Sequence, residues 1–122
     1  MKVMVIVKAT QDSEAGVLPS AELLAEMGQF NEQLLKAGVM LAAEGLQDSS
    51  KGVRVRFANG SSTVIDGPFT ETKELIAGFW LWQVRSLDEA VEWIRRSPFR
   101  NSSEAVELRP VMAAQDLVAP KR

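Results

Sequence analysis

Two runs of consecutive apolar residues constrain the fold of this chain more than any other feature. Residues 3–7 are an unbroken, mostly β-branched run, and residues 79–84 are apolar except for Gln83 and contain two tryptophans. A strand with one solvated face alternates apolar and polar residues, whereas a strand that is covered on both faces is apolar throughout. Both runs are therefore predicted to be strands that are covered on both faces.

Two helices are predicted from their start and stop signals and from their apolar stripes. Ser20 is the expected N-cap of the first helix, and Gly38 is expected just past its end. Ser86 and Glu89 have the spacing of a capping box at the start of the second helix, which Pro98 ends. The predicted buried stripes are Leu23, Met27, Phe30 and Leu34 in the first helix and Leu87, Ala90, Val91 and Ile94 in the second.

The remaining segments complete an α+β pattern. Residues 39–43 and 106–109 have the character of strands, and the turn at 66–68 precedes a segment, 70–75, that is expected to make one helical turn. Residues 53–57 and 63–65 flank Asn59-Gly60, which predicts a β-hairpin with one solvated face. The resulting order is two split βαβ units around an inserted hairpin. We therefore predict a ferredoxin-like fold.

This topology leaves one face of the sheet without a helix. Right-handed crossovers put both helices on the same face, yet the two central strands are apolar on both faces. A second copy of the chain is the simplest cover for the other face, so we expect a homodimer that forms a dimeric α/β barrel. Val5, Trp80 and Trp82 are the predicted interface residues. Alternation alone does not tell which set of residues faces the helices.

Length and composition limit the classes of protein to consider. The 122 residues suit a single domain, predicted at 1–112 with a tail at 113–122. A net charge of -2 offers no general attraction for nucleic acid or for membrane lipids. The chain has no cysteine and no histidine, so no disulfide, thiolate site, metal or other cofactor is expected. The short apolar start suits neither a signal peptide nor a spanning segment, and a cytoplasmic location is expected.

One motif resembles a known family. The segment DGPFTETKE at 66–74, with AAEGL before it and GFWLWQVRSLDEAVEW and ELRPVM after it, resembles the DGPF (DGPFAETKE) branch of the YCII-related family. The resemblance extends from residue 1 to about residue 112. It implies a ferredoxin-like fold whose dimer forms an α/β barrel. It also implies a regulatory partner, because relatives are often encoded beside extracytoplasmic-function sigma factors.

The proposed catalytic pair of more distant relatives is not expected here. That pair consists of a histidine on the first helix and an aspartate nearby, and this chain has no histidine. The candidates are instead taken from the motif. Asp66 precedes a glycine, so it either holds the turn in shape or acts as a general base. The turn role is the more common one for such a residue.

Charged residues around the motif have two readings. Lys73 and Glu71 form either a solvated surface patch or part of a ligand site, with Glu44 and Arg109 as expected neighbours. Phe69 is expected in the core, at the dimer interface or against a ligand.

Two functions follow from these residues. The first is a small dimeric module that binds a small molecule or a sigma factor or other regulatory protein. The second is a cofactor-free enzyme that acts on a small aromatic or anionic molecule in the barrel cleft. In that reading Asp66 or Glu44 is the base, and Lys73 or Arg109 holds negative charge. The lack of histidine favours the binding module.

Overall fold

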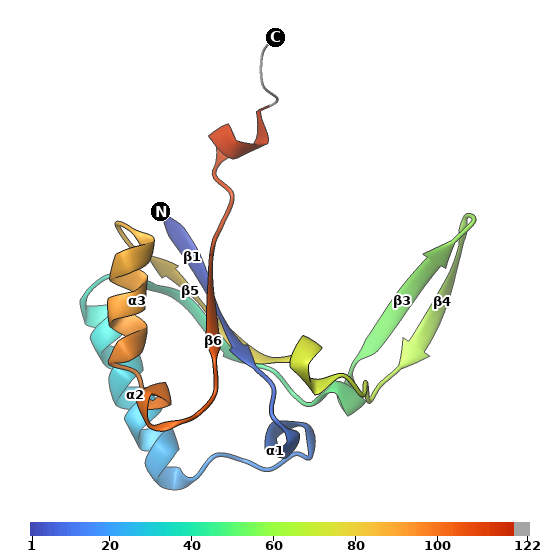
Figure 1. The fold of residues 1–122 in the computed structure, drawn as a ribbon, viewed down its shortest axis with the longest axis horizontal. Coiled ribbons are helices and arrows are strands. Elements are labelled where there is room, and N and C mark those ends of the chain that lie inside the picture. Colours follow the sequence, from blue (N-terminus) through green and yellow to red (C-terminus); the bar gives the residue numbers. More distant parts are fainter. Residues whose placement is uncertain (119–122) are drawn as a thin grey trace.

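The computed structural model describes residues 1–118 and has the predicted α+β ferredoxin-like topology. Four antiparallel strands form one sheet in the order β2-β5-β1-β6, and two helices pack on one of its faces (Figure 1). Among residues 1–118, no helix is long and apolar enough to span a bilayer. The elements of this body are β1 (Lys2–Lys8), α2 (Ala21–Lys36), β2 (Met40–Gly45), β5 (Ile76–Gln83), α3 (Leu87–Arg95) and β6 (Val106–Pro110).

The predicted caps of both helices are present. The Ser20 hydroxyl accepts a hydrogen bond from the Leu23 backbone N–H at 3.1 Å, and Gly38 has a φ of 71°, which glycine adopts without strain. At the second helix the Ser86 hydroxyl accepts from the Glu89 backbone N–H at 3.1 Å. The Glu89 carboxylate accepts from the backbone N–H of Arg85, one residue before the position that a capping box uses.

Short helical segments occur between the larger elements. The polar stretch after β1 contains a single helical turn, which Thr10 and Ser13 cap reciprocally. The sequence pattern did not predict this turn. The helical turn expected within residues 70–75 is present as a 3-10 segment. The short elements are α1 (Gln11–Glu14), η1 (Ser49–Lys51), η2 (Thr72–Glu74), η3 (Pro98–Asn101) and η4 (Ala114–Leu117).

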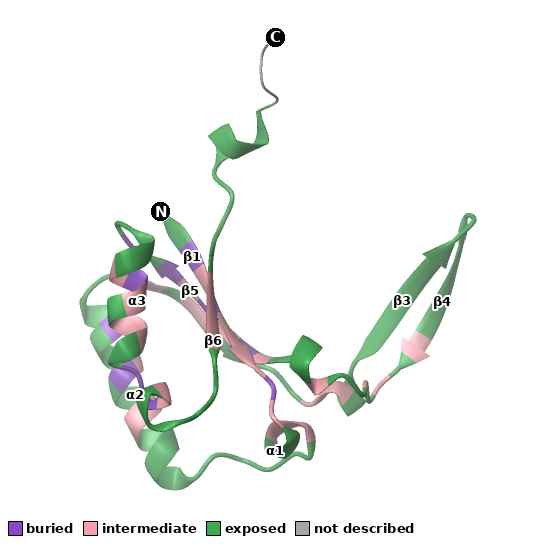
Figure 2. Ribbon diagram, viewed as in Figure 1, coloured by how far each residue is buried: buried purple, intermediate pink, exposed green. Residues whose placement is uncertain are grey.

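The core lies between the sheet and its two helices. Val5 pairs with Trp80 and Val3 pairs with Trp82, so all four side chains point to the same face. Phe30 and Leu34 of α2 and Ala90 of α3 pack on them, and Val3, Val5 and Trp82 are each 0% exposed. Figure 2 shows that the buried positions gather where the helices meet the sheet.

The structure decides which set of strand residues faces away from the helices. Met4, Ile6, Phe79 and Leu81 point to the other side and stay half-buried; we call them the open face. The prediction that Val5, Trp80 and Trp82 form the dimer interface is therefore wrong. The helices of their own chain already bury these three side chains, so no second copy can reach them.

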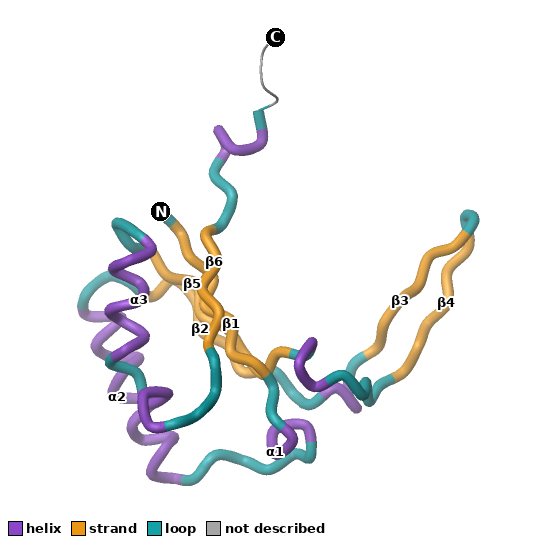
Figure 3. The backbone as a smooth tube through the Cα atoms, in the orientation of Figure 1, coloured by secondary structure: helices purple, strands orange, loops and turns teal. Residues whose placement is uncertain are grey.

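The inserted hairpin stands apart from the body. β3 (Val53–Ala58) and β4 (Ser61–Asp66) pair only with each other, and Asn59 and Gly60 both have positive φ, as a two-residue hairpin turn requires. This hairpin, which we call the arm, extends away from the helices on the far side of the sheet (Figures 1 and 3). One solvated face was predicted, but every residue of β3 is exposed. The part of the chain that the structure describes leaves both faces of β3 exposed.

Candidate ligand-binding cleft

A cleft of about 310 Å³ lies between β2, β5, α2 and η3. It exists because the sheet has almost no side chains beneath this part of α2: Gly45 pairs with Gly78, and Gly78 pairs in turn with Val7. A Cβ atom on Gly78 would lie 2.8 Å from the carbonyl oxygen of Glu44. A larger residue at position 78 would therefore push β2 away from β5.

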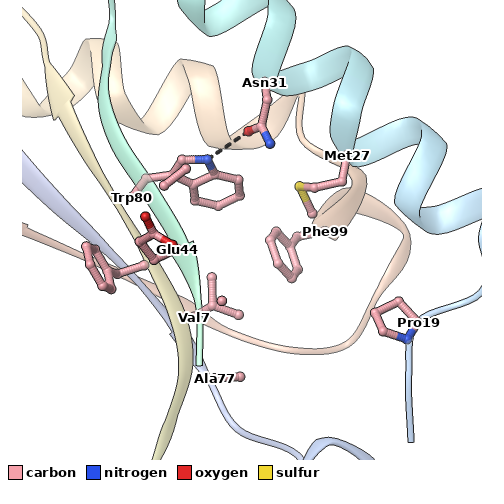
Figure 4. Close-up of a pocket in the computed structure, with 12 residues that line it drawn as sticks. Val7, Pro19, Met27, Asn31, Glu44, Ala77, Trp80 and Phe99 are labelled. Carbon is pink, nitrogen blue, oxygen red and sulfur yellow. Dashed lines mark hydrogen bonds between the residues drawn. The ribbon is translucent and has the colours of Figure 1, made fainter. Parts of the chain in front are cut away.

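Apolar and aromatic side chains form the walls of the cleft. Met27 projects from α2, Trp80 from β5 and Phe99 from η3 (Figure 4). The Trp80 and Phe99 rings meet edge to face, with centroids 6.1 Å apart and an interplanar angle of 88°. These contacts hold two aromatic rings at a right angle beside the empty space, which suits a flat ligand.

Asn31 is a polar group of the cleft that the core itself orients. Its side-chain oxygen accepts a hydrogen bond from the indole Nε1–H of Trp80 at 2.9 Å. This bond directs the amide nitrogen toward the space between Trp80 and Met27, as Figure 4 shows. The amide nitrogen has two N–H donors. Asn31 can therefore donate to an acceptor atom of a bound molecule.

Glu44 is the other polar side chain of the cleft. It lies exposed on the edge strand β2 and is paired in register with Phe79, which also lines the cleft. Among residues 1–118 no Lys or Arg lies within salt-bridge distance of its carboxylate. Its register with Phe79 puts the Glu44 side chain on the open-face side of β2, so Glu44 lies at the rim of the cleft and its carboxylate is free to accept hydrogen bonds there.

The other predicted catalytic residue lies elsewhere. Asp66 is exposed at the end of β4, and among residues 1–118 its carboxylate makes no hydrogen bond. The predicted hydrogen bonds to its own turn are therefore absent from this part of the chain. Asp66 does not line the cleft.

The predicted ligand-binding charges are also not brought together. Glu71 and Lys73 are exposed on and beside η2, outside the cleft. Arg109 lies on β6, at the opposite edge of the sheet from Glu44, with its side chain 71% exposed and its Nε 3.8 Å from Glu107. The strand order puts Arg109 and Glu44 at opposite edges of the sheet, so these two residues are not neighbours in one site. The expectation that Lys73 lies beside Glu44 stays a prediction.

The DGPF motif forms the joint between the arm and the body. The Phe69 backbone N–H donates to Ser49 Oγ at 3.0 Å, and the Gly67 N–H donates to the Gly52 carbonyl at 3.0 Å. The Arg54 guanidinium stacks over the Phe69 ring at 3.8 Å from its centroid. Phe69 and Arg54 border a second, open hollow of about 530 Å³ at this joint. These contacts give the motif a structural role before any ligand is considered.

Sequence reasoning missed Asn31 and Phe99 as cleft residues. Asn31 lies four residues after Met27 and next to Phe30, so it is a polar residue at the margin of the apolar stripe of α2. That position was a usable signal, since a polar residue at such a margin needs a partner. Phe99 gave no signal, because it follows Pro98, the predicted end of the second helix. Residues 1–118 hold no group of three potential metal ligands.

Comparisons with known proteins agree with this architecture. The model of the YCII-related domain matches residues 1–115. A protein of Rhizobium meliloti (strain 1021), itself described as uncharacterized, is 31% identical over 90 residues, which are 73% of each chain. A solved structure of 5-chloro-2-hydroxyhydroquinone dehydrochlorinase from Burkholderia phenoliruptrix AC1100, in complex with 2,5-dihydroxybenzoquinone, has a TM-score of 0.54. It covers 94% of this chain and 97% of its own at 15% identity, which shows the shared fold.

These matches place the chain in a family. The fold defines the chain as an α+β protein with a four-stranded antiparallel sheet and two helices on one of its faces. Within that class, the chain belongs to the YCII-related domain family.

Proposed function

We propose that this protein binds a small, flat, aromatic molecule in the cleft beside α2. The observation that carries the proposal is the right-angled pair of Trp80 and Phe99 beside an empty space of about 310 Å³. Mostly apolar walls with few polar groups are the usual composition of a small-molecule site, and this volume is at the lower end of the usual range.

The two polar residues define the ligand further. Asn31 offers an N–H donor inside the cleft, so it suits a carbonyl or phenolic oxygen. Glu44 offers a carboxylate at the rim, so it suits a hydroxyl donor. A ring that carries both kinds of oxygen fits this arrangement. The ligand printed for the dehydrochlorinase structure, 2,5-dihydroxybenzoquinone, is a ring of this class.

The working unit of this proposal is a homodimer formed through the open face. Phe79, Leu81, Met4 and Ile6 occupy two neighbouring rows of the sheet. Glu44 and Glu107 lie at the two ends of one row, and Arg109 lies at one end of the other. An apolar centre with a polar rim is the usual anatomy of a protein interface. Since Phe79 and Glu44 also line the cleft, a second copy on the open face would lie next to the bound ligand.

A titration of the full chain tests the binding proposal. The probes are hydroquinone, 2,5-dihydroxybenzoquinone and benzoate, measured by isothermal calorimetry and by the rise in melting temperature. Met27→Trp fills the cleft and should abolish binding of the ring that the unmodified protein prefers. Leu24→Trp is the matched control, because Leu24 lies on the same helix and is 57% exposed outside the cleft. Equal binding by both variants would show that the ligand lies elsewhere.

A second candidate is an enzyme in which Glu44 is the general base. Its carboxylate at the cleft rim favours this candidate, and the activity printed for the structural neighbour is one on a hydroxylated ring. Glu44 would take the proton from a ring hydroxyl of the bound molecule. Asp66 has no part in this candidate, because it does not line the cleft. The expectation of a sigma factor or other regulatory protein as a partner rests on the family resemblance alone.

Glu44→Gln separates the enzyme from the binding module. The substitution keeps the size of the side chain and one acceptor oxygen, but it replaces the other oxygen with an NH2 donor and removes the basic form. An enzyme should convert a bound ring to product, followed by liquid chromatography, and the variant should be slowed at least 100-fold while still binding the ring. If the unmodified protein binds a ring and returns it unchanged, the enzyme candidate is wrong and the binding module remains.

A further inference from the structure

The arm has an apolar face that its own chain leaves exposed. Val55 and Val64 are direct partners in the hairpin, and alternation puts Val53 and Phe57 on the same side. The exposed fractions are 58% for Val53, 48% for Val55, 78% for Phe57 and 62% for Val64. Val53, Val55 and Phe57 form an apolar row along β3, and Val64 lies beside Val55. Asp66 and Ser62, the partners of Val53 and Phe57, lie at the two ends of this face.

A hairpin of this kind does not hold its shape by itself in water. An isolated two-stranded hairpin is marginally stable at best, because it needs a third strand, a helix or another surface against its apolar face. The arm pairs with no other strand of the described chain, since β3 and β4 form a sheet of two. An exposed apolar surface rimmed by polar residues is typical of a site that another molecule covers.

The joint sets the direction in which the arm extends. A Cβ atom on Gly67 would lie 1.8 Å from the Ser49 carbonyl oxygen, so the two segments of the joint are in direct contact. The backbone N–H of Ser49 donates to Glu14 Oε2 at 3.0 Å, and the Ser49 hydroxyl also donates to the same carboxylate. These contacts tie the base of the arm to α1 and hold it on the side of the sheet opposite the helices (Figure 1).

A second copy of this chain fits the arm better than any other occupant. A stable interface buries about 800 Å² on each partner. The open face offers four side chains that are already half-buried, and the arm adds four exposed apolar side chains to the surface that a second copy can cover. Because the arm extends on the open-face side of the sheet, a copy that sits on the open face comes within its reach. Arg54 and Arg56 alternate with the apolar residues of β3, so they lie on the opposite face of the arm and leave the apolar face free to dock on a body.

We propose that each arm docks its apolar face on the body of the second copy, so that two arms clasp the dimer reciprocally. This inference rests on the homodimer of the proposed function and assigns the arm as its main apolar contact. It also assigns a role to the DGPF motif: the motif is the joint that aims the arm at the partner. Two-fold symmetry makes every arm contact occur twice.

Sedimentation equilibrium of the full chain tests the clasp. The double variant Phe57→Ser with Val64→Ser replaces two apolar side chains of the arm with polar ones. It should raise the dimer dissociation constant at least tenfold. Thr63→Ser is the matched control, because Thr63 is the neighbour of Val64 on the opposite face of the same strand. The control should stay within twofold of the unmodified protein. An unchanged dissociation constant for the double variant would overturn the proposal.

Hydrogen exchange of the arm separates the clasp from dimerisation itself. The arm amides should be protected in the dimer and should lose that protection on dilution and in Leu81→Glu, which places a charge on the open face. If the protein dimerises while its arm amides exchange freely, the clasp is wrong and the dimer stands. Equal protection in dimer and monomer would mean that the chain covers its own arm, which also overturns the clasp. If the protein stays monomeric at every concentration, both the clasp and the homodimer are wrong.

Discussion

The strands of the body and of the arm have similar sequences, but the first are buried and the second are exposed. Val5 of β1 and Val55 of β3 are both β-branched residues at the centre of antiparallel strands, yet Val5 is 0% exposed and Val55 is 48% exposed. Helices α2 and α3 cover the first strand, whereas no element of the described chain covers the arm. The comparison teaches that alternation specifies a strand but does not specify what covers it.

This difference has an energetic consequence. Full burial of a Val, Leu or Phe side chain contributes about 1.5–3 kcal/mol to stability relative to exposure. The body gains this contribution at each residue of its core, whereas the arm gains little within a single chain. We therefore expect the body to fold alone and the order of the arm to depend on a second copy. The following predictions test this contrast from the largest expected effect to the smallest.

Neighbouring residues on β5 should respond in opposite ways to a charge. Trp80→Glu places a carboxylate beneath the helices and should unfold the protomer, because an unpaired buried charge costs several kcal/mol. Leu81→Glu places it on the open face and should leave the protomer folded while the dimer dissociates. Circular dichroism and light scattering distinguish the two outcomes. A Leu81→Glu chain without secondary structure would contradict the assignment of the faces.

Removal of an aromatic ring should matter in the body and not in the arm of a monomer. Trp82→Ala leaves a cavity in the core and should cost about 3–5 kcal/mol. Phe57→Ala should change the free energy of unfolding by less than about 0.5 kcal/mol, as is usual for surface residues. Both are measured by urea denaturation in the Leu81→Glu background. A large effect of Phe57→Ala in this monomer would mean that the arm packs on its own body.

Two glycines should differ in the sign of their effect. Gly67→Ala forces a Cβ against the Ser49 carbonyl at the joint and should cost about 1–3 kcal/mol, the usual cost of overpacking. Gly28→Ala has nothing within 4 Å of the new Cβ on α2 and should stabilise the chain by about 0.5–1 kcal/mol. Chemical denaturation measures both. A neutral Gly67→Ala would show that the joint yields easily and does not aim the arm.

The start of α3 should show a small pH dependence. The backbone N–H of Arg85 donates to Glu89 Oε1 at 3.0 Å, and this bond is the main cause that holds the pKa of Glu89 below its ordinary value of 4.5, against some desolvation. A carboxyl whose folded pKa is lowered stabilises the fold above its ordinary pKa and loses this contribution as the pH falls through the folded value. Carbon-detected NMR titration of Glu89 should show the lowered pKa. Glu89→Gln should remove this part of the pH dependence below pH 4.5.

The helices and turns of the fold could be predicted from the sequence, because residues close to each of them in the chain determine where it begins and ends. Ser20 and Gly38 bound α2 through hydrogen bonds and a backbone angle that involve only a few residues of chain. Asn59-Gly60 specifies the hairpin turn for the same reason. The order of these elements and the handedness of their crossovers then leave few possible topologies. The family resemblance agreed with this reading.

The candidate site could not be predicted to the same extent. Glu44 was singled out and does line the cleft, but its expected neighbour Arg109 lies at the opposite edge of the sheet. The cleft itself results from missing side chains at Gly45 and Gly78, which come together only when β2 pairs with β5. A space between elements leaves no pattern in the sequence of either element.

The sequence by itself determined the strands, the helices, their order and the need to cover a sheet that is apolar on both faces. Only the tertiary structure decided that Val5, Trp80 and Trp82 face the helices while Met4, Phe79 and Leu81 do not. The physical reason is the two-residue period of a strand: both sets of residues are apolar, so either could face the core. The packing of α2 and α3 selects the set with the two tryptophans, because Phe30 meets both rings edge to face and Asn31 accepts the indole N–H of Trp80.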